Sequence, residues 1–268
     1  MEEPIKIGLA LSGGGARGIA HIGVIKALEE NGIFPDAVSG ASAGAIIGAL
    51  YASGRTPDEM MDFVKDVTLL KIFKVGLPIG GLTNLTYLKK RLSSYLAEDN
   101  FEHLQKPLFI ALSNLNTGEC EIRHSGQLFN VIMASCAIPL VFKPVEIDGN
   151  QYVDGGLLNN LPIAPLAEIT DFRIGVNVIP HVKTAGSNVQ TLVGIATRCF
   201  ELSLLANIRP SLTICDFLIE PKRVHAFNIF QFNQYERLFE IGYKSAIEQI
   251  PQLKEKIVAI EKSRSQVI

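Results

Sequence analysis

Residues 5–54 alternate between short apolar runs and helical patterns, and this alternation restricts the fold more than any other feature of the chain. Residues 5–11 form an apolar run typical of a buried parallel strand. A glycine-rich turn follows, and then a helical pattern that ends at Asn31-Gly32. Residues 37–39 have the composition of a second strand, and residues 43–52 that of a buried helix. A β-α-β-α order of this kind predicts an α/β protein with a mainly parallel sheet.

The rest of the chain continues the alternation, with a hairpin turn at Asp148-Gly149-Asn150. Strands are predicted at 108–112, 119–123, 145–147, 151–153, 172–178 and 216–219, and helices at 57–67, 85–96, 192–205 and 236–250. The 268 residues suffice for one large core. We therefore predict a three-layer α/β/α sandwich around a mainly parallel central sheet, in a single domain over residues 1–268.

Composition and charge exclude several classes of protein. Hydrophobic residues make up 47% of the chain and charged residues 19%, which is a globular composition rather than a disordered one. The formal net charge of −2 gives no basic field that would recruit nucleic acid, so we expect no nucleic-acid partner. Any contact with a lipid surface has to be local and apolar. The oligomeric state is not readable from the sequence.

The N-terminus and the cysteines predict the compartment. No basic segment followed by an apolar stretch is present at the N-terminus, so we expect no secretory signal. The longest apolar-rich window, residues 41–52, is too short to cross a bilayer. The four cysteines show neither Cys-x-x-Cys pairs nor metal-ligand spacing, so we expect no metal site. These features predict a cytoplasmic protein, with a transient contact to a membrane surface left open.

The pentapeptide Gly40-Ala41-Ser42-Ala43-Gly44 matches Gly-x-Ser-x-Gly and lies between a predicted strand and a predicted helix, as a nucleophile elbow requires. In so tight a turn, side chains at 40 and 44 would collide with the neighbouring strand and helix. The turn lifts the Ser42 hydroxyl to a helix N-terminus, which favours developing negative charge. A helix start capped by Ser42 remains the structural alternative. We predict that Ser42 is a nucleophile.

The glycine-rich loop over residues 13–18 follows the first strand and opens a helix. It formally matches the dinucleotide motif Gly-x-Gly-x-x-Gly, which requires an acidic residue at the end of the second strand. Asp36 instead precedes that strand, and the Ser42 elbow occupies the end. Consecutive glycines let main-chain amides point into one concavity, so this loop can form an oxyanion hole beside Ser42. Arg17 either supplies positive charge there or anchors the loop to a carboxylate.

Asp154-Gly155-Gly156 ends a predicted hairpin strand, where a carboxylate can project from a loop edge while two glycines permit close approach. An ordinary Asp-Gly turn is the alternative, and Asp148-Gly149 suits that role better. A carboxylate base needs its pKa raised by a dry pocket. Among the five histidines, His225 has the position expected for a Ser-His-Asp triad, and His21 is expected to pack within its helix.

Together, residues 11–18, 40–44 and 154–156 resemble the patatin-like phospholipase family in its smaller bacterial form. The stretches 135–145 and 159–162 also look like this family, and the resemblance covers about residues 5–180. It implies hydrolysis of lipid acyl esters, of the phospholipase A, lysophospholipase or esterase type, with no metal or organic cofactor. It implies a Ser42–Asp154 dyad without histidine. The implied oxyanion hole consists of Gly13, Gly14 and Gly15 with Arg17, and the motif glycines are Gly18, Gly40, Gly44, Gly155 and Gly156.

The sequence departs from the family pattern in two places. It has Asp154-Gly155-Gly156 where some members have Asp-Gly-Ala, and Ser12 where plant members have an acid. We expect neither change to remove the chemistry. A Ser-His-Asp esterase or acyltransferase, and a non-catalytic module that binds nucleotide or lipid, stay open as alternatives.

An acyl chain needs an apolar channel, for which two segments are candidates. Residues 69–82 form an apolar segment with little periodicity, a candidate flap. Phe227, Ile229, Phe230 and Phe232 form a candidate wall. In both cases burial in the core is the favoured interpretation. The helical spacing of Leu253, Ile257 and Ile260 favours docking on the body of the protein.

Overall fold

The computed structural model describes residues 4–66, 85–181 and 190–265. The candidate flap at residues 69–82 lies outside these ranges. The strands are β1 (Ile7–Leu11), β2 (Ala37–Gly40), β3 (Leu108–Asn114), β4 (Cys120–Arg123), β5 (Val145–Ile147), β6 (Asn150–Asp154), β7 (Phe172–Val176) and β8 (Phe217–Ile219). The helices are α1 (Ala20–Glu30), α2 (Ala43–Ala52), α3 (Pro57–Asp66), α5 (Thr86–Tyr95), α6 (Leu128–Ser135), α7 (Ala164–Ala167), α8 (Leu192–Leu212) and α9 (Tyr235–Ser265). The 3₁₀ turns used below are η1 (Gly15–Ile19), η3 (Gly155–Leu157) and η5 (Lys222–Ala226).

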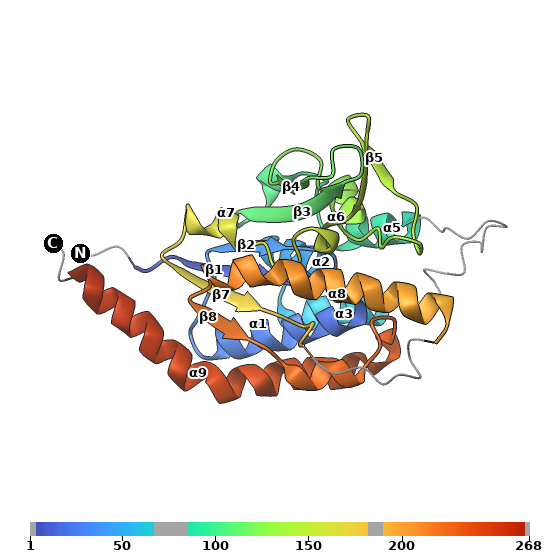
Figure 1. Cartoon of the computed structure of the whole chain (residues 1–268). Helices are drawn as coiled ribbons and strands as arrows, with labels where there is room; N and C mark the ends of the chain where they lie inside the picture. The colour runs from blue at the N-terminus through green and yellow to red at the C-terminus, as the bar shows by residue number, and fades with distance from the viewer. Residues whose placement is uncertain (1–3, 67–84, 182–189, 266–268) are drawn as a thin grey trace.

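One sheet joins the eight described strands, and its centre is parallel (Figure 1). Strand β1 pairs in parallel with β2 and β7, β2 with β3, and β7 with β8. Strands β4 and β6 pair antiparallel to β3, and β5 antiparallel to β6. The prediction of a mainly parallel sheet is confirmed, with an antiparallel extension at the β3 end.

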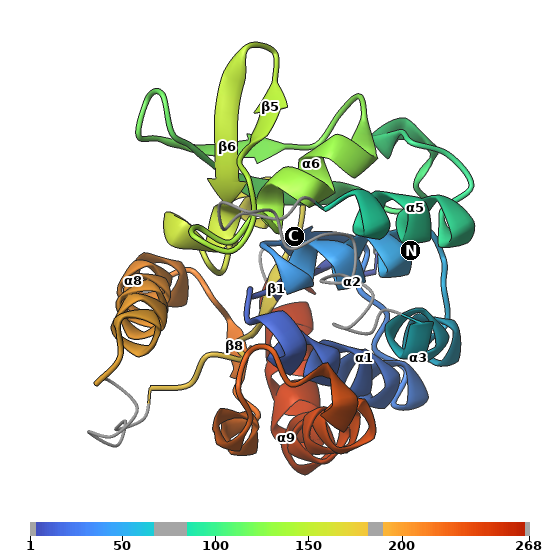
Figure 2. The ribbon, with the colours of Figure 1, turned by 90° about the vertical axis from the view of Figure 1, so that its right-hand side faces the viewer.

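Helices cover both faces of this sheet, because successive side chains of a strand point to opposite faces. Leu9 and Leu11 of β1 pack in a core with α1, α2 and α9, whereas Ala10 packs on the other face with residues of α7 and α8. Figure 2 shows α8 on one side of the molecule and α1, α2 and α3 on the other. The structure therefore has the three layers that the sequence predicts.

Strands β2 and β6 lie end to end along one edge of β3. Ile110 pairs with Gly40 of β2 and also with Arg123 of β4. Leu112 pairs with Asp154 of β6 and also with Glu121 of β4. Because a strand has two edges and β4 occupies one of them at both positions, β2 and β6 share the other. Their carboxyl ends therefore meet beside Ala111.

The helices differ from the predictions at four points, the first being the short helix α7, which was not predicted. Helix α6 was not predicted, and its first residue has no side-chain cap to mark it in the sequence. Helix α8 ends at Leu212, beyond the predicted end at 205. Helix α9 continues through Pro251 to Ser265, because buried Ile250 and Leu253 hold it on the core across the hydrogen bond that proline removes.

Most of the apolar side chains that were expected to pack in the core after residue 220 are buried or half-buried. Leu253 is buried, and Ile257 and Ile260 pack against the core, so this part of α9 docks on the body. Phe227 and Ile229 are buried, whereas Phe230 and Phe232 are half-buried. None of the helices in the described ranges combines the length and the apolar character that crossing a membrane requires.

Candidate active site

Ser42 follows β2 and precedes α2 at a turn that only small residues permit. Its backbone has φ 52° and ψ −121°, a left-handed region that non-glycine residues rarely adopt. A Cβ atom on Gly40 would overlap the Gly44 carbonyl, and one on Gly44 would overlap the Leu11 carbonyl. The collisions expected from the pentapeptide are therefore present. The Ser42 side chain stands at the N-terminus of α2, where the helix dipole favours negative charge.

The Ser42 hydroxyl contacts the Asp154 carboxylate. Oγ of Ser42 donates a hydrogen bond of 2.6 Å to Oδ2 of Asp154, and both residues are buried. The other carboxylate oxygen, Oδ1, accepts the amide of Gly156 at 2.8 Å. The Asp154 amide donates to the Ala137 carbonyl at 2.9 Å. With both carboxylate oxygens and its amide in hydrogen bonds, the acid has a fixed orientation toward Ser42.

Burial changes the acidity of Asp154. Removal from water raises the pKa of this carboxyl from its ordinary 3.8 to about 7, against the opposing effect of hydrogen bonds from Ser42 and Gly156. An aspartate that acts as a base at neutral pH requires a pKa raised in this direction. A carboxylate with a pKa near 7 can accept and return a proton at neutral pH.

Ser135 supports Ser42 from the end of α6, although no role was predicted for Ser135. Its hydroxyl donates to the Ala111 carbonyl at 2.8 Å and accepts the Ser42 amide at 2.9 Å. Ser135 thus ties the strained elbow to the position on β3 where β2 and β6 meet. The only sequence signal was its place in the stretch 135–145.

The glycine loop lies beside Ser42. A Cβ atom added to Gly13 would be only 3.1 Å from the Cβ atom of Ser42. The Gly13 amide itself is occupied: it donates to Oδ1 of Asn160 at 3.1 Å and to the Asn160 carbonyl at 3.2 Å. The amides of Gly14 and Gly15 donate to no acceptor within the described ranges. Of the three amides predicted for the oxyanion hole, these two are available.

Polar groups at the base of this loop bond to one another, except for Nδ1 of His21, which is buried without a partner among the described residues. The Ser12 hydroxyl donates to the Gly13 carbonyl and accepts the Val178 amide, both at 3.0 Å. Nε2 of His21 lies 2.8 Å from the Ser12 carbonyl and donates to it. Burial lowers the pKa of His21 to about 4, so the imidazole stays neutral. His21 is therefore a buried support of the loop, as expected from the sequence.

Arg17 anchors the loop. Its Nε donates to the Phe227 carbonyl at 2.8 Å, and Nη1 lies 3.4 Å from Oε1 of Glu201. Burial lowers the pKa of this guanidinium, and the negative charge of Glu201 opposes that effect. Of the two roles considered for Arg17, anchoring to a carboxylate is the one for which the structure shows contacts.

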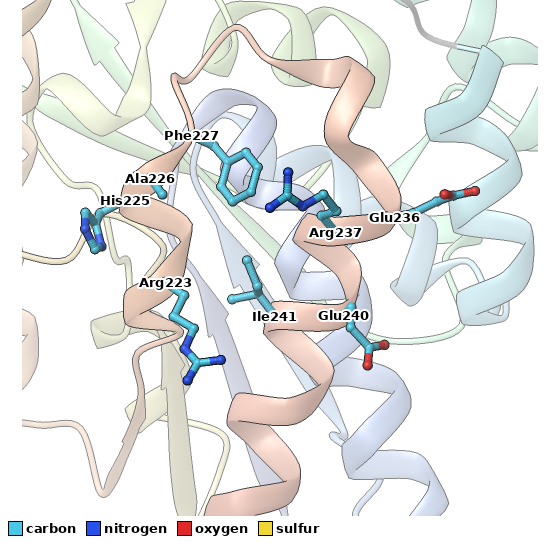
Figure 3. Close-up of a pocket in the computed structure, with 8 residues that line it drawn as sticks. All are labelled: Arg223, His225, Ala226, Phe227, Glu236, Arg237, Glu240 and Ile241. Carbon is cyan, nitrogen blue, oxygen red and sulfur yellow. The ribbon is translucent and has the colours of Figure 1, made fainter.

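The five histidines all lie within the described ranges, and none forms a hydrogen bond with Ser42 or Asp154. His225 lies on η5, where Nδ1 donates to the Lys222 carbonyl at 2.6 Å. It borders a separate groove of about 670 Å³ between η5 and α9, shown in Figure 3. The triad alternative thus finds no histidine at the Ser42 hydroxyl.

The dinucleotide alternative also finds little support in the structure. Asp36 precedes β2 and its Oδ2 accepts the Ile7 amide at 2.7 Å, at the end of the sheet opposite the glycine loop. In the part of the chain that the structure describes, no group of three or more His, Cys, Asp or Glu side chains is arranged to hold a metal ion.

Comparison with known proteins decides the family. A family profile described as patatin-like phospholipase matches residues 9–167, more than half of the chain. The chain belongs to the patatin-like phospholipase family. The matched range includes Ser42, Asp154 and the glycine loop, so the resemblance seen in the sequence is confirmed at family level.

The similar sequences include NTE family proteins. An uncharacterized NTE family protein of Mycobacterium bovis is 35% identical over 177 residues, which are 65% of this chain and 49% of that protein. The lysophospholipase NTE1 of Mycosarcoma maydis is 27% identical over 91% of this chain and 15% of its own length. The human patatin-like phospholipase domain-containing protein 6 is 26% identical over 89% of this chain and 20% of its own. The chain thus spans half or less of the length of these relatives.

Solved structures show the same fold at low sequence identity. VipD from Legionella pneumophila aligns with a TM-score of 0.55 and 15% identity, over 89% of this chain and 67% of that one. Human group IVD cytosolic phospholipase A2, in complex with methyl gamma-linolenyl fluorophosphonate, aligns with a TM-score of 0.55 and 12% identity. That alignment covers 98% of this chain and 60% of the phospholipase chain.

Proposed function

We propose that the protein is a lipid acyl hydrolase that cleaves fatty acyl esters through a Ser42–Asp154 dyad and an acyl-enzyme intermediate. The single observation that carries the proposal is the 2.6 Å hydrogen bond from the Ser42 hydroxyl to a buried carboxylate. A serine hydroxyl needs a proton acceptor within hydrogen-bond reach, and Asp154 meets that requirement. The elevated pKa of Asp154 supports the same role.

The first half of the reaction acylates Ser42. As Oγ of Ser42 bonds to the ester carbonyl carbon, its proton passes to the Asp154 carboxylate. The carbonyl oxygen becomes an oxyanion held by main-chain amides. When the tetrahedral intermediate collapses, the bond to the alcohol oxygen breaks, and that oxygen takes the proton from Asp154. An acyl-serine and a free alcohol or lysolipid result.

The second half releases the fatty acid. Asp154, again ionised, takes a proton from a water molecule as that water attacks the acyl-serine carbonyl. The second tetrahedral intermediate expels Oγ of Ser42, which regains its proton from Asp154. The products are the fatty acid and the starting enzyme, so no other proton donor is needed.

We assign the oxyanion hole to the amides of Gly14 and Gly15. The Gly13 amide is held by Asn160, and the Arg17 guanidinium is held by Phe227 and Glu201. Gly13 and Arg17 then shape and anchor the loop rather than contact the oxyanion. One hydrogen-bond donor of this kind contributes roughly 3–4 kcal/mol to stabilisation of the transition state.

The relatives support a fatty acyl ester as the substrate class. Among the similar sequences, one is named a lysophospholipase and another a patatin-like phospholipase domain-containing protein. The structurally similar phospholipase A2 was solved with a fluorophosphonate carrying a linolenyl chain. We therefore propose a lipid ester as substrate, met at a membrane or micelle surface.

Labelling with a fluorophosphonate probe tests the proposal. We expect wild-type protein to be labelled, because the probe phosphorylates an activated serine, and Ser42→Ala to lose labelling completely. His225→Ala is the matched control and should be labelled at the wild-type rate, since His225 contacts the Lys222 carbonyl and not the dyad. Gel fluorescence with mass spectrometry of the labelled peptide measures the outcome.

Two results would redirect the proposal. Loss of labelling in His225→Ala would favour a Ser-His-Asp triad. An unlabelled wild-type protein whose melting temperature rises with NAD or ATP would favour a nucleotide-binding module.

The pH dependence of hydrolysis tests the base. We expect kcat/KM for a soluble short-chain ester to fall below an apparent pKa of about 7, because Asp154 accepts a proton only when ionised. The acid limb should titrate with a slope of one. Initial rates across a buffer series at constant ionic strength measure it, and a limb near pH 4 would mean that Asp154 behaves as an ordinary exposed acid.

A further inference from the structure

Asn207 on helix α8 lies beyond the range matched by the family profile and binds one loop three times. Its Nδ2 donates to the Gly156 carbonyl at 2.7 Å and to the Leu157 carbonyl at 3.0 Å. Its Oδ1 accepts the Asn160 amide at 2.8 Å. Both donor hydrogens of this side-chain amide are therefore used, and all its bonds go to main-chain atoms of residues 156–160.

The two ends of this loop touch the two halves of the candidate site. At one end, the Gly156 amide donates to Oδ1 of Asp154 at 2.8 Å. At the other end, Asn160 accepts the Gly13 amide through both its side-chain and its main-chain oxygen. Asn207 thus holds the short piece of chain that connects the base to the glycine loop.

Asn160 is oriented by its bond to the glycine loop. It is fully buried, and its Nδ2 has no hydrogen-bond partner among the described residues. A buried amide donor left without a partner costs about 1–3 kcal/mol. Turning the amide over would place this donor against the Gly13 N–H, so Oδ1 has to face Gly13. The fixed orientation makes the Asn160–Gly13 contact sensitive to the position of the loop.

We propose that Asn207 is a positioning residue that fixes the orientation of Asp154 and the placement of the oxyanion amides. This inference rests on the proposed function, because it assigns Asn207 to the same dyad and glycine loop. Loss of the Asn207 amide leaves two carbonyls and one N–H of the loop without their partner. The Gly156 bond to Asp154 then weakens, and since that bond lowers the pKa of the carboxyl, the pKa rises.

The test compares Asn207→Leu and Asn207→Asp with wild type. For Asn207→Leu we expect kcat to fall by about 10- to 100-fold, because small displacements of catalytic groups have effects of this size. KM for a soluble ester should stay close to the wild-type value, and the acid limb of kcat/KM should move to higher pH. Asn207→Asp keeps the acceptor for Asn160 but adds negative charge near Asp154, so its acid limb should move further up.

Asn130→Leu is the matched control. Asn130 is also a half-buried helical asparagine, but its amide bonds to Gln127, which precedes α6, and to Lys89 of α5, and contacts neither Asp154 nor the glycine loop. Its kcat and pH profile should equal those of wild type. Circular dichroism and melting temperature establish that each variant is folded.

Each outcome either supports or refutes the positioning role of Asn207. If a folded Asn207 variant keeps the wild-type kcat and acid limb, the positioning role is refuted. If Asn207→Leu fails to fold, Asn207→Asp, which has the wild-type volume, decides alone. Loss of folding in both would also overturn the inference, because Asn207 would then serve overall stability. If the wild-type protein is not labelled by a fluorophosphonate, the proposed function itself fails, so the two failures are distinguishable.

Discussion

Replacing Asp154 with asparagine should stop ester hydrolysis and, above about pH 7, make the protein more stable. Activity should fall by at least about 1,000-fold, because the general base of a nucleophilic mechanism is lost while the oxyanion hole remains. The amide has the shape of the carboxyl group, so it can still accept the Gly156 amide and contact Ser42. The fold around the site should therefore persist.

The stability gain follows from the raised pKa of Asp154. The buried carboxyl keeps its proton up to about pH 7, whereas the unfolded chain loses it near 3.8. Wild-type stability from this group is thus fully present below pH 3.8 and is lost as the pH rises to about 7. A difference of this size corresponds to an upper bound of roughly 4 kcal/mol. Asparagine does not ionise, so its free energy of unfolding lacks this loss. The stability advantage of the variant over wild type should therefore grow from about pH 3.8 to about pH 7 and stay constant above it.

Urea unfolding at pH 4 and pH 8 measures this effect. The variant and wild type should be close at pH 4, and the variant should be more stable at pH 8. Asp58→Asn, whose side chain is 85% exposed, is the control and should change stability by no more than about 0.5 kcal/mol at either pH. An Asp154→Asn variant that is less stable than wild type at pH 8 would show that the ionised carboxylate is well solvated.

Replacing Gly15 with alanine should lower kcat by about 100- to 1,000-fold with little change in KM, the effect expected when an oxyanion donor is displaced. Gly15 has φ +56°, and a Cβ atom there would overlap the Ile229 carbonyl. That carbonyl accepts the Ala16 amide at 2.7 Å, so the loop has no room to move away without losing a hydrogen bond. The free amides of Gly14 and Gly15 would shift as a result.

Gly32→Ala provides a matched control for the Gly15 variant. Gly32 also has a positive φ of 76°, but a Cβ atom there meets nothing within 4 Å. Backbone strain of about 1 kcal/mol should lower its stability without affecting kcat. Steady-state kinetics with a soluble ester, together with melting temperatures, separate the two effects. A Gly15→Ala variant with wild-type kcat would remove this amide from the oxyanion hole.

The sequence predicts the parts of the site whose geometry is local. A side chain on Gly40 would collide with Gly44 four positions on, and one on Gly44 would collide with Leu11 at the end of the neighbouring strand β1. Both glycines belong to one short pentapeptide, so they are visible as a pattern. The strand-turn-strand around Asp148-Gly149 is equally local and was predicted within one residue. The proximity of Asp154 to Ser42 came only from family resemblance, because their sequence separation of 112 residues leaves no local signal.

The contacts that sequence reasoning missed are long-range and involve common polar residues. Asn207 lies in no motif, and Ser135 is marked only by its place in the stretch 135–145. What distinguishes both residues is the partner that folding brings to each. The Gly13 amide was predicted to face the substrate, yet Asn160, far along the chain, occupies it. Helix α9 was predicted too short, because packing of its apolar face outweighs the local effect of Pro251.

The end-to-end arrangement of β2 and β6 means that β3 sets the spacing between Ser42 and Asp154. Ser42 follows the strand that stops opposite Ile110, and Asp154 ends the strand that stops opposite Leu112. Their separation is therefore measured in residues of a third strand and does not depend on the length of chain between them. Segments between Ser42 and Asp154 can therefore differ in length without changing the spacing of these two side chains.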